Sequence, residues 1–304
     1  MATRHDHHRH HQHPAVPDPR TGATLRLAAA LTIGFAVVEA LGGWWTGSLA
    51  LVSDAGHMLT DGAALGLGAA AAWLARRPPS QRHSYGFGRA EILAAAINAA
   101  TMLVIATALA FESISRLNAP ESVNGAAAAV IALAGLGLNL AVLRWLSPHS
   151  HDLNTRAARL HVMGDVLGSV AALASAALIA FTGWTRADPI ASLAICALIG
   201  VSSVRLLREV VHALMEGVPH NLSVETVGRE MARVEGIVSV HDLHVWMLSG
   251  SRTALSAHVV VRSLAHWDRT LRELQTQLHA RFGIDHVTIQ PEPQQQPLVR
   301  AFKK

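Results

Sequence analysis

The sequence predicts an α-helical membrane protein with six transmembrane helices, followed by a small α+β domain. Apolar residues make up 51% of the 304 residues and charged residues 15%, a balance that is unusual for a soluble protein of this length. Apolar segments occupy most of residues 25–210, and several reach the roughly 20 residues that cross about 30 Å of hydrocarbon. From Val218 onward the sequence is mixed and polar with short strand-like segments, which indicates a second domain outside the membrane.

The apolar segments are expected to form six successive helices. They are Leu25–Trp45, Leu49–Ala75, Ala90–Phe111, Gly125–Leu146, Ala157–Phe181 and Pro189–Leu207. Arginine gathers in the tail before the first segment and in the connections after the second, fourth and sixth. Because cytoplasmic loops are enriched in Lys and Arg, both termini are expected in the cytoplasm, and the even number of spans agrees. The near absence of lysine beside abundant arginine suggests a bacterial protein, and hence its inner (plasma) membrane.

The second domain is expected to contain two helices and three strands. In chain order these are a helix that begins after Ser223, strands at Ile237–Leu248 and Thr253–Val261, a helix at His266–Phe282 and a short strand at Val287–Gln290. The residues Ser249-Gly-Ser are typical of a hairpin turn, and Gly283 is typical of a helix end.

Four regions follow from these segments. They are a His-rich disordered cytoplasmic tail at residues 1–24, a transmembrane domain at 25–211, a cytoplasmic α+β domain at 212–293 and a tail at 294–304. The first tail holds six histidines, at positions 5, 7, 8, 10, 11 and 13. Such a tract can bind divalent metals loosely through neutral imidazoles; a purification tag is the alternative interpretation.

Two His-x-x-x-Asp pairs lie inside apolar segments: His57 with Asp61, and His161 with Asp165. Four residues along a helix give about 6 Å of rise and roughly 40° of rotation, so each pair points off one face. An ionisable residue at bilayer depth costs about 2.5–3.5 kcal/mol on insertion scales, which makes it a functional candidate. Two imidazole nitrogens and two carboxylate oxygens suit a tetrahedral divalent metal such as zinc. The alternative is that each pair forms a buried contact between packed helices.

Counting residues along the segments does not by itself place the two His-Asp pairs at the same depth in the membrane. His57 lies about ten residues from the outer end of its segment and His161 more than twenty, an offset of more than two helical turns. Other polar residues also fall in or beside the segments, namely Glu39, Asp54, Asn98, Asn139 and Asp188. They are expected to form interhelical hydrogen bonds and helix caps, with a relay role for Glu39 and Asp54 as the alternative.

Longer motifs surround both pairs. The second segment reads Gly47-Ser-Leu-Ala-Leu-Val-Ser-Asp-Ala-Gly-His-Met-Leu-Thr-Asp61, and the third opens with His83-Ser-Tyr-Gly-Phe-Gly-Arg-Ala-Glu91. The fifth contains Leu160-His-Val-Met-Gly-Asp-Val-Leu-Gly-Ser169, and the sixth begins with Ala187-Asp-Pro-Ile-Ala-Ser192. In these motifs the chain resembles the cation diffusion facilitator family, on its zinc-transporter branch. The resemblance implies a homodimer of six-helix subunits that exports Zn²⁺ in exchange for protons by alternating access, with Cd²⁺ or Co²⁺ as further candidate substrates.

The resemblance also implies which residues bind metal. The transport site would consist of His57, Asp61, His161 and Asp165. The order of helices and strands in the second domain resembles a ferredoxin-like metallochaperone, and His241-Asp-Leu-His-Val-Trp246 and Ala257-His-Val259 match the family's cytoplasmic motifs. Its regulatory Zn²⁺ ligands would be His241 and His258, completed by His286 and Glu292; exposed histidines without metal are the alternative. Phe87 stands where some members have a histidine, so a further site between the second and third spans is not expected.

Two other classes of function compete with transport. An intramembrane zinc enzyme needs an open coordination position and a nearby base, whereas a His₂Asp₂ set fills all four positions and no Gly-x-Ser-x-Gly motif is present. A membrane-anchored metal sensor would not need ligand pairs inside its spans. Nucleic acid is not an expected partner, because the basic residues follow the membrane topology. The sequence therefore favours a transporter, not an enzyme.

Overall fold

The structure is a computed structural model that describes residues 19–146, 153–249 and 252–294; the side chains of residues 19–26, 146 and 153–161 are not described. The N-terminal histidine tract therefore lies outside the described residues. Two compact units divide the chain. One contains the residues up to Gly62 together with Ile105–Leu198, and the other contains Ala63–Val104 together with the residues from Ile199 onward.

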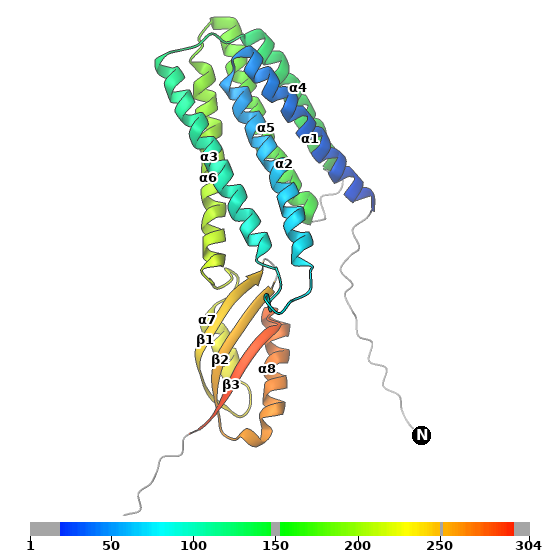
Figure 1. Ribbon diagram of the computed structural model, residues 1–304, viewed down its shortest axis with the longest axis vertical. Coiled ribbons are helices and arrows are strands. Elements are labelled where there is room, and N and C mark those ends of the chain that lie inside the picture. The colour runs from blue at the N-terminus through cyan, green and yellow to red at the C-terminus, as the bar shows by residue number, and fades with distance from the viewer. Residues whose placement is uncertain (1–18, 147–152, 250–251, 295–304) are drawn as a thin grey trace, which may run out of the picture. The chain divides into compact units, whose positions relative to one another are not determined.

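Six long helices precede the α+β elements, as the hydropathy pattern predicts (Figure 1). They are α1 (Pro19–Thr46), α2 (Leu49–Ala75), α3 (Ala90–Asn118), α4 (Gly125–Leu146), α5 (Leu153–Thr182) and α6 (Ala187–Leu214). Each contains a segment that is long and apolar enough to cross a membrane. Helix α3 continues past the predicted end at Phe111 because Glu112 and Arg116, one turn apart, form an ion pair of 2.9 Å on its last turns.

Small residues allow the helices of the first unit to approach closely. Helix α4 packs against both α1 and α5. A Cβ on Gly135 of α4 would lie only 2.7 Å from Cε1 of Phe35 of α1, so a larger residue there would displace the Phe35 ring. A buried cluster of five small or medium apolar positions and one leucine joins α2, α4 and α5: Ala50, Leu51, Ala128, Ala132, Ala172 and Ala176. Close packing of this kind is how helices associate in lipid, where apolar burial gives no advantage.

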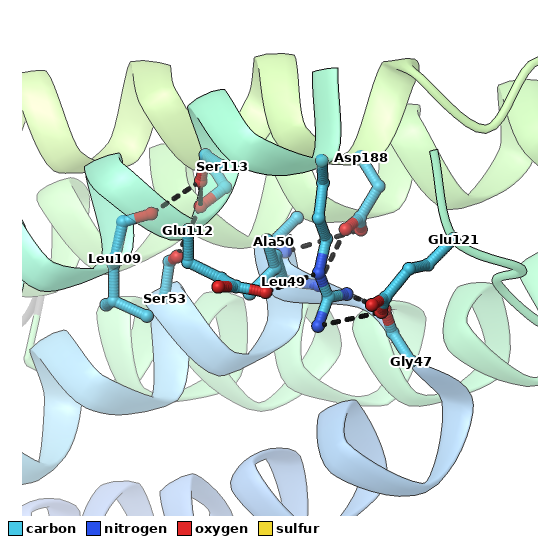
Figure 2. A network of polar contacts seen from close by, with 11 residues as sticks. Gly47, Leu49, Ala50, Ser53, Leu109, Glu112, Ser113, Glu121 and Asp188 are labelled. Atoms are coloured by element: carbon cyan, nitrogen blue, oxygen red, sulfur yellow. Dashed lines mark hydrogen bonds and ion pairs between the residues drawn. The ribbon is translucent and has the colours of Figure 1, made fainter. Parts of the chain in front are cut away.

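The start of α2 is anchored inside the first unit by Asp188, near the start of α6 (Figure 2). The Asp188 carboxylate accepts hydrogen bonds from Ser48 Oγ at 2.5 Å, Leu49 N at 2.6 Å and Ala50 N at 3.3 Å. The first N–H groups of a helix lack intrahelical partners, and a carboxylate satisfies them both by hydrogen bonding and by its charge. Arg116 fixes the preceding turn by donating to the carbonyl of Gly47 at 2.8 Å.

The second unit contains the α+β elements in the predicted order. They are α7 (Val224–Ala232), β1 (Ile237–Ser249), β2 (Arg252–Val261), α8 (Trp267–Phe282) and β3 (His286–Pro293). The sheet order is β1-β2-β3, with β1 antiparallel and β3 parallel to β2 (Figure 1). Both helices bury apolar side chains in one core with the sheet, for example Met231 of α7, Leu274 of α8 and Leu255 of β2.

Local sequence explains the ends of these elements. Ser223 caps α7 by accepting a hydrogen bond from Thr226 N, and Gly283 ends α8 with φ of 66°, a left-handed conformation that glycine adopts without strain. Strand β3 is longer than the predicted Val287–Gln290 because its parallel pairing with β2 runs over eight residues.

Candidate metal centres

The first candidate centre lies in the apolar helices and joins α2 with α5. His57 and Asp61 lie one turn apart on α2, with 3.5 Å between His57 Nδ1 and Asp61 Oδ2. The other ring nitrogen of His57 lies 3.9 Å from Oδ1 of Asp165 on α5. The three side chains each offer a ligand atom, and these atoms lie within 4.8 Å of one another. The Asp165 side chain is fully buried, and the other two are 21% and 14% exposed.

His161, the fourth predicted member of this group, lies on α5 one turn before Asp165. Its side chain belongs to those that the structure does not describe, so its part in the group stays a prediction.

The two helices meet in antiparallel register, which resolves the depth offset in the sequence. Ser169 of α5 donates from Oγ to Oδ2 of Asp54 at 2.9 Å, and about one turn further along α2 His57 lies against Asp165. At 1.5 Å per residue, Ser169 lies roughly 20 Å from the end of α5, whereas Asp54 lies roughly 8 Å from the start of α2. The offset between the helix ends is therefore real. His57 and Asp165 meet although α2 begins only about 12 Å before His57, because α2 begins at a buried turn.

Buried polar side chains surround the next turn of the bundle. Glu39 of α1, Asp54, Asn139 of α4 and Ser169 are all 0% or 1% exposed. Asn139 Nδ2 donates to Ser169 Oγ at 3.1 Å, so Asn139, Ser169 and Asp54 form the expected interhelical hydrogen bonds. A Cβ on Gly168 would lie 2.2 Å from Asp54 Oδ1, so only glycine permits this approach of α5 to the Asp54 carboxylate.

The second candidate centre lies on the sheet, where three adjacent strands each contribute one side chain. His241 of β1 is the cross-strand partner of His258 of β2. The Glu292 carboxylate of β3 contacts both rings, at 3.0 Å from His241 Nε2 and 2.9 Å from His258 Nδ1. Hydrogen bonds from His258 and His241 hold the pKa of Glu292 below its usual value. The carboxylate is therefore ionised over the whole neutral range, as a metal ligand must be.

The structure does not bring His286 to this second group, so its part as a ligand stays a prediction. In the β2–β3 register His286 pairs with Ala254, whereas His258 pairs with Gln290 four residues further along β3. At about 3.3 Å per residue this separates His286 from the group by roughly 13 Å of strand. His286 instead places its ring edge-on to Tyr85, with the ring centroids 5.5 Å apart.

Asp242 is a neighbour of this group that the sequence analysis missed. It lies in an irregularity of β1 between His241 and His244, with φ of 50°. The irregularity brings Asp242 Oδ2 to 4.0 Å from His258 Nε2, and Oδ1 to 3.2 Å from His244 Nε2. In a regular strand Asp242 would point to the opposite face from His241. The motif His-Asp-x-His was the available signal, but strand alternation argued against it.

Comparison with known proteins decides the family. The model of the cation efflux transmembrane domain matches residues 25–215, and the model of the cation efflux protein cytoplasmic domain matches residues 219–294. The chain belongs to the cation efflux family. This confirms the resemblance to cation diffusion facilitators that the motifs around the two His-Asp pairs indicate.

Relatives of this cation efflux protein match it over most of their length. The zinc transporter ZitB of Escherichia coli is 41% identical over 97% of this chain and 93% of its own length. The cadmium, cobalt and zinc/H(+)-K(+) antiporter of Bacillus subtilis is 39% identical over 88% of both chains. The metal cation efflux system protein CzcD of Cupriavidus metallidurans is 39% identical over 93% of this chain and 89% of its own.

One solved structure covers only the second domain. The metal-bound C-terminal domain of the CzcD transporter from Cupriavidus metallidurans is 35% identical, with a TM-score of 0.23, over 23% of this chain and 99% of that chain. The family models and the full-length relatives carry the functional conclusion instead. This cation efflux protein is a multi-pass membrane transporter of metal ions and not an enzyme.

Proposed function

We propose that the protein exports Zn²⁺ from the cytoplasm in exchange for protons by alternating access, with the ion held by His57, Asp61, His161 and Asp165. The observation that carries this proposal is that His57, Asp61 and Asp165 gather their ligand atoms within 4.8 Å among the apolar helices. Relatives named as a zinc transporter and as a cadmium, cobalt and zinc/H(+)-K(+) antiporter support the same substrate class and the use of protons.

The donor types favour zinc over the abundant hard cations. Imidazole is a good ligand for Zn²⁺, whereas Mg²⁺ and Ca²⁺ take oxygen ligands in larger coordination shells. Two imidazoles and two carboxylates would complete a tetrahedral zinc site of net charge zero. Ligand softness alone does not separate Zn²⁺ from Cd²⁺ or Co²⁺, so these ions are further candidate substrates.

Proton exchange follows from the burial of the acidic ligands. Asp165 is fully buried and faces His57, while Asp61 lies on the adjacent turn. Buried carboxylates without a counter-charge are costly, so an ion that leaves must be replaced by another positive charge. Neutral imidazole and ionised carboxylate bind metal, whereas their protonated forms do not, so metal and protons compete for the same atoms. In one half of the transport cycle Zn²⁺ thus displaces protons from the ligands, and in the other half protons displace Zn²⁺.

The wider arrangement belongs to the same proposal. Both termini lie in the cytoplasm of a bacterial cell and the six helices span its inner membrane, on the basis of the arginine distribution. The transmembrane domain comprises residues 25–211, and the cytoplasmic domain, residues 212–293, joins two subunits into a homodimer. The match of residues 219–294 to the family's cytoplasmic domain supports this assembly.

A pH gradient is expected to drive zinc transport in proteoliposomes. With Zn²⁺ outside and a more acidic interior, protein oriented with its cytoplasmic side outward should take up Zn²⁺ while the interior becomes alkaline. A fluorescent zinc indicator and a trapped pH dye would follow the two ions together. Empty liposomes are the control for leak. A rate that is unchanged after nigericin collapses the gradient would rule out proton coupling.

The sheet centre is proposed to bind a regulatory Zn²⁺ through His241, His258 and Glu292. The donor set suits the ion, because one carboxylate already contacts both rings and the three residues come from adjacent strands. A bound cation would neutralise the acidic residues here, Asp242 among them, and so bias the transport equilibrium.

Substitution of His258 by Ala is expected to weaken zinc binding at the sheet centre by about 10–100-fold. The measurement is a zinc titration of the full-length protein carrying Asp165→Asn, so that the membrane site does not contribute. The lowered pKa of Glu292 keeps its carboxylate ionised throughout the neutral range, so this ligand should bind zinc there without losing a proton. His279→Ala is the matched control, an exposed histidine beside Asp285; an equal loss there would contradict the assignment.

A further inference from the structure

Glu39 is a fully buried carboxylate that the proposed transport site does not use. It lies on α1 with 0% exposure, and neither carboxylate oxygen has a hydrogen-bond donor among the described residues. Its Oε1 lies against Gly135 of α4, 3.3 Å from the position that a Cβ would take there. A charge or polar group so placed normally has a partner, because burial without one costs free energy.

Two further oxygens in the same region lack donors. Among the described residues, Asp54 Oδ1 and Asn139 Oδ1 are buried without a hydrogen bond. The direction of the local hydrogen bonds explains why. The Ser169 hydroxyl donates its hydrogen bond to Asp54 Oδ2, so it can only accept from Asn139, through Nδ2. The amide oxygen of Asn139 therefore receives no hydrogen bond from Ser169.

These oxygens belong to neighbouring parts of one region. Gly135, beside Glu39, and Asn139 lie one turn apart on α4, and Asn139 is linked through Ser169 to Asp54. The region thus holds two acidic groups and an amide oxygen from three helices, and among the described residues only Asp54 Oδ2 of their oxygens accepts a hydrogen bond.

We infer that Glu39, Asp54 and Asn139 form a second, weaker cation station, about one turn from His57 toward the start of α2. The inference rests on the proposed function for the identity of the ion, a transported divalent cation. In the orientation proposed from the arginine residues, the start of α2 faces away from the cytoplasm. The station would therefore receive the ion as it leaves the transport site.

The donor chemistry suits a station of this kind. Carboxylate and amide oxygens bind Zn²⁺ less strongly than a set that includes imidazoles, because Zn²⁺ prefers nitrogen and sulfur donors. A pathway conducts an ion when binding is favourable enough for entry and when a nearby weaker site allows departure. A weak oxygen site beside a tight site would therefore speed release without changing the affinity of the tight one.

The test compares Glu39→Gln, which keeps the shape and removes the charge, with the parent and with Glu209→Gln, an exposed glutamate of α6. Equilibrium dialysis of the full-length protein against Cd²⁺ would count tight and weak ions. Zinc flux in proteoliposomes would give kcat and KM. Glu39→Gln is expected to lose one weak ion per chain and to slow kcat by about tenfold, the lower end for groups that support a metal site, with KM within about twofold. Glu209→Gln should keep the weak ion and the kcat of the parent.

Unchanged ion counts and unchanged kcat in Glu39→Gln would overturn the station and leave Glu39 as a packing group. Loss of the tight ion as well would also overturn it, since Glu39 would then belong to the transport site. Glu39→Asp keeps the charge and should retain the weak ion, which excludes a general folding defect. Failure of the proposed function is seen separately: if Asp165→Asn transports zinc normally while Glu39→Gln loses the weak ion, only the transport-site assignment falls.

Discussion

Asp165→Asn is expected to reduce zinc flux by about 100-fold or more, since even indirect partners of metal ligands are worth 10–100-fold. The substitution keeps the size of the side chain and replaces a carboxylate that is fully buried against His57. An amide cannot supply the negative charge that a divalent ion needs at this depth. The measurement is initial Zn²⁺ uptake into proteoliposomes, with the amount of correctly inserted protein fixed by immunoblot.

Ser175→Ala is the matched control for this variant. Ser175 lies on the same helix, is 5% exposed and donates to the carbonyl of Ala172 at 3.0 Å, so the change also removes a buried polar group. Flux in this variant should stay close to that of the parent. Flux within about twofold of the parent in Asp165→Asn would remove the carboxylate from the metal pathway, because loss of a ligand costs far more.

Asp188→Ala is expected to lower the free energy of unfolding by about 3 kcal/mol, because three buried donors lose their acceptor at once. These are Ser48 Oγ, Leu49 N and Ala50 N, all at the start of α2. For a chain of 304 residues, with an unfolding entropy of about 2.1 cal/mol/K per residue, such a loss corresponds to roughly 5 °C in Tm. Thermal unfolding in detergent, followed by tryptophan fluorescence, would measure it. Asp188→Asn keeps one acceptor oxygen, so its Tm should lie between those of the parent and of Asp188→Ala.

Glu121→Ala is the control from the same network (Figure 2). Glu121 is 60% exposed and contacts Arg116 at 3.1 Å, and an ion pair at the surface contributes at most about 1 kcal/mol. The Tm of Glu121→Ala should therefore move by no more than about 2 °C. Equal shifts in Asp188→Ala and Glu121→Ala would mean that the start of α2 does not depend on the carboxylate of α6.

Much of this fold could be predicted from the sequence because each element carries a local signal. Uninterrupted apolar segments define the six helices, and Ser223 and Gly283 mark helix ends by their capping chemistry. The spacing of His57 and Asp61 puts both side chains on one face of α2 whatever the helix packs against. These features depend only on residues a few positions apart.

The remaining features depend on contacts between distant segments. Hydropathy places the start of α2 at Leu49 but cannot show that this helix end is buried, because its anchor is Asp188, about 140 residues away in the sequence. His286 lies far from His258 because of the register in which β3 pairs with β2. The alternation of side chains along a strand does not fix this register, because a shift by any even number of residues keeps the same side chains on the same face. Asp242 reaches His258 only through a local irregularity of β1.

Because the start of α2 is anchored to Asp188, a tilt of this helix would turn about Leu49. Measured from that residue along the axis, Asp54 lies at roughly 8 Å, His57 at roughly 12 Å and Asp61 at roughly 18 Å. A tilt of α2 about the pivot therefore displaces Asp61 more than twice as far as Asp54. A single swing would displace His57 and Asp61 relative to Asp165 by roughly 1.6 and 2.4 times the displacement of Asp54 relative to Ser169.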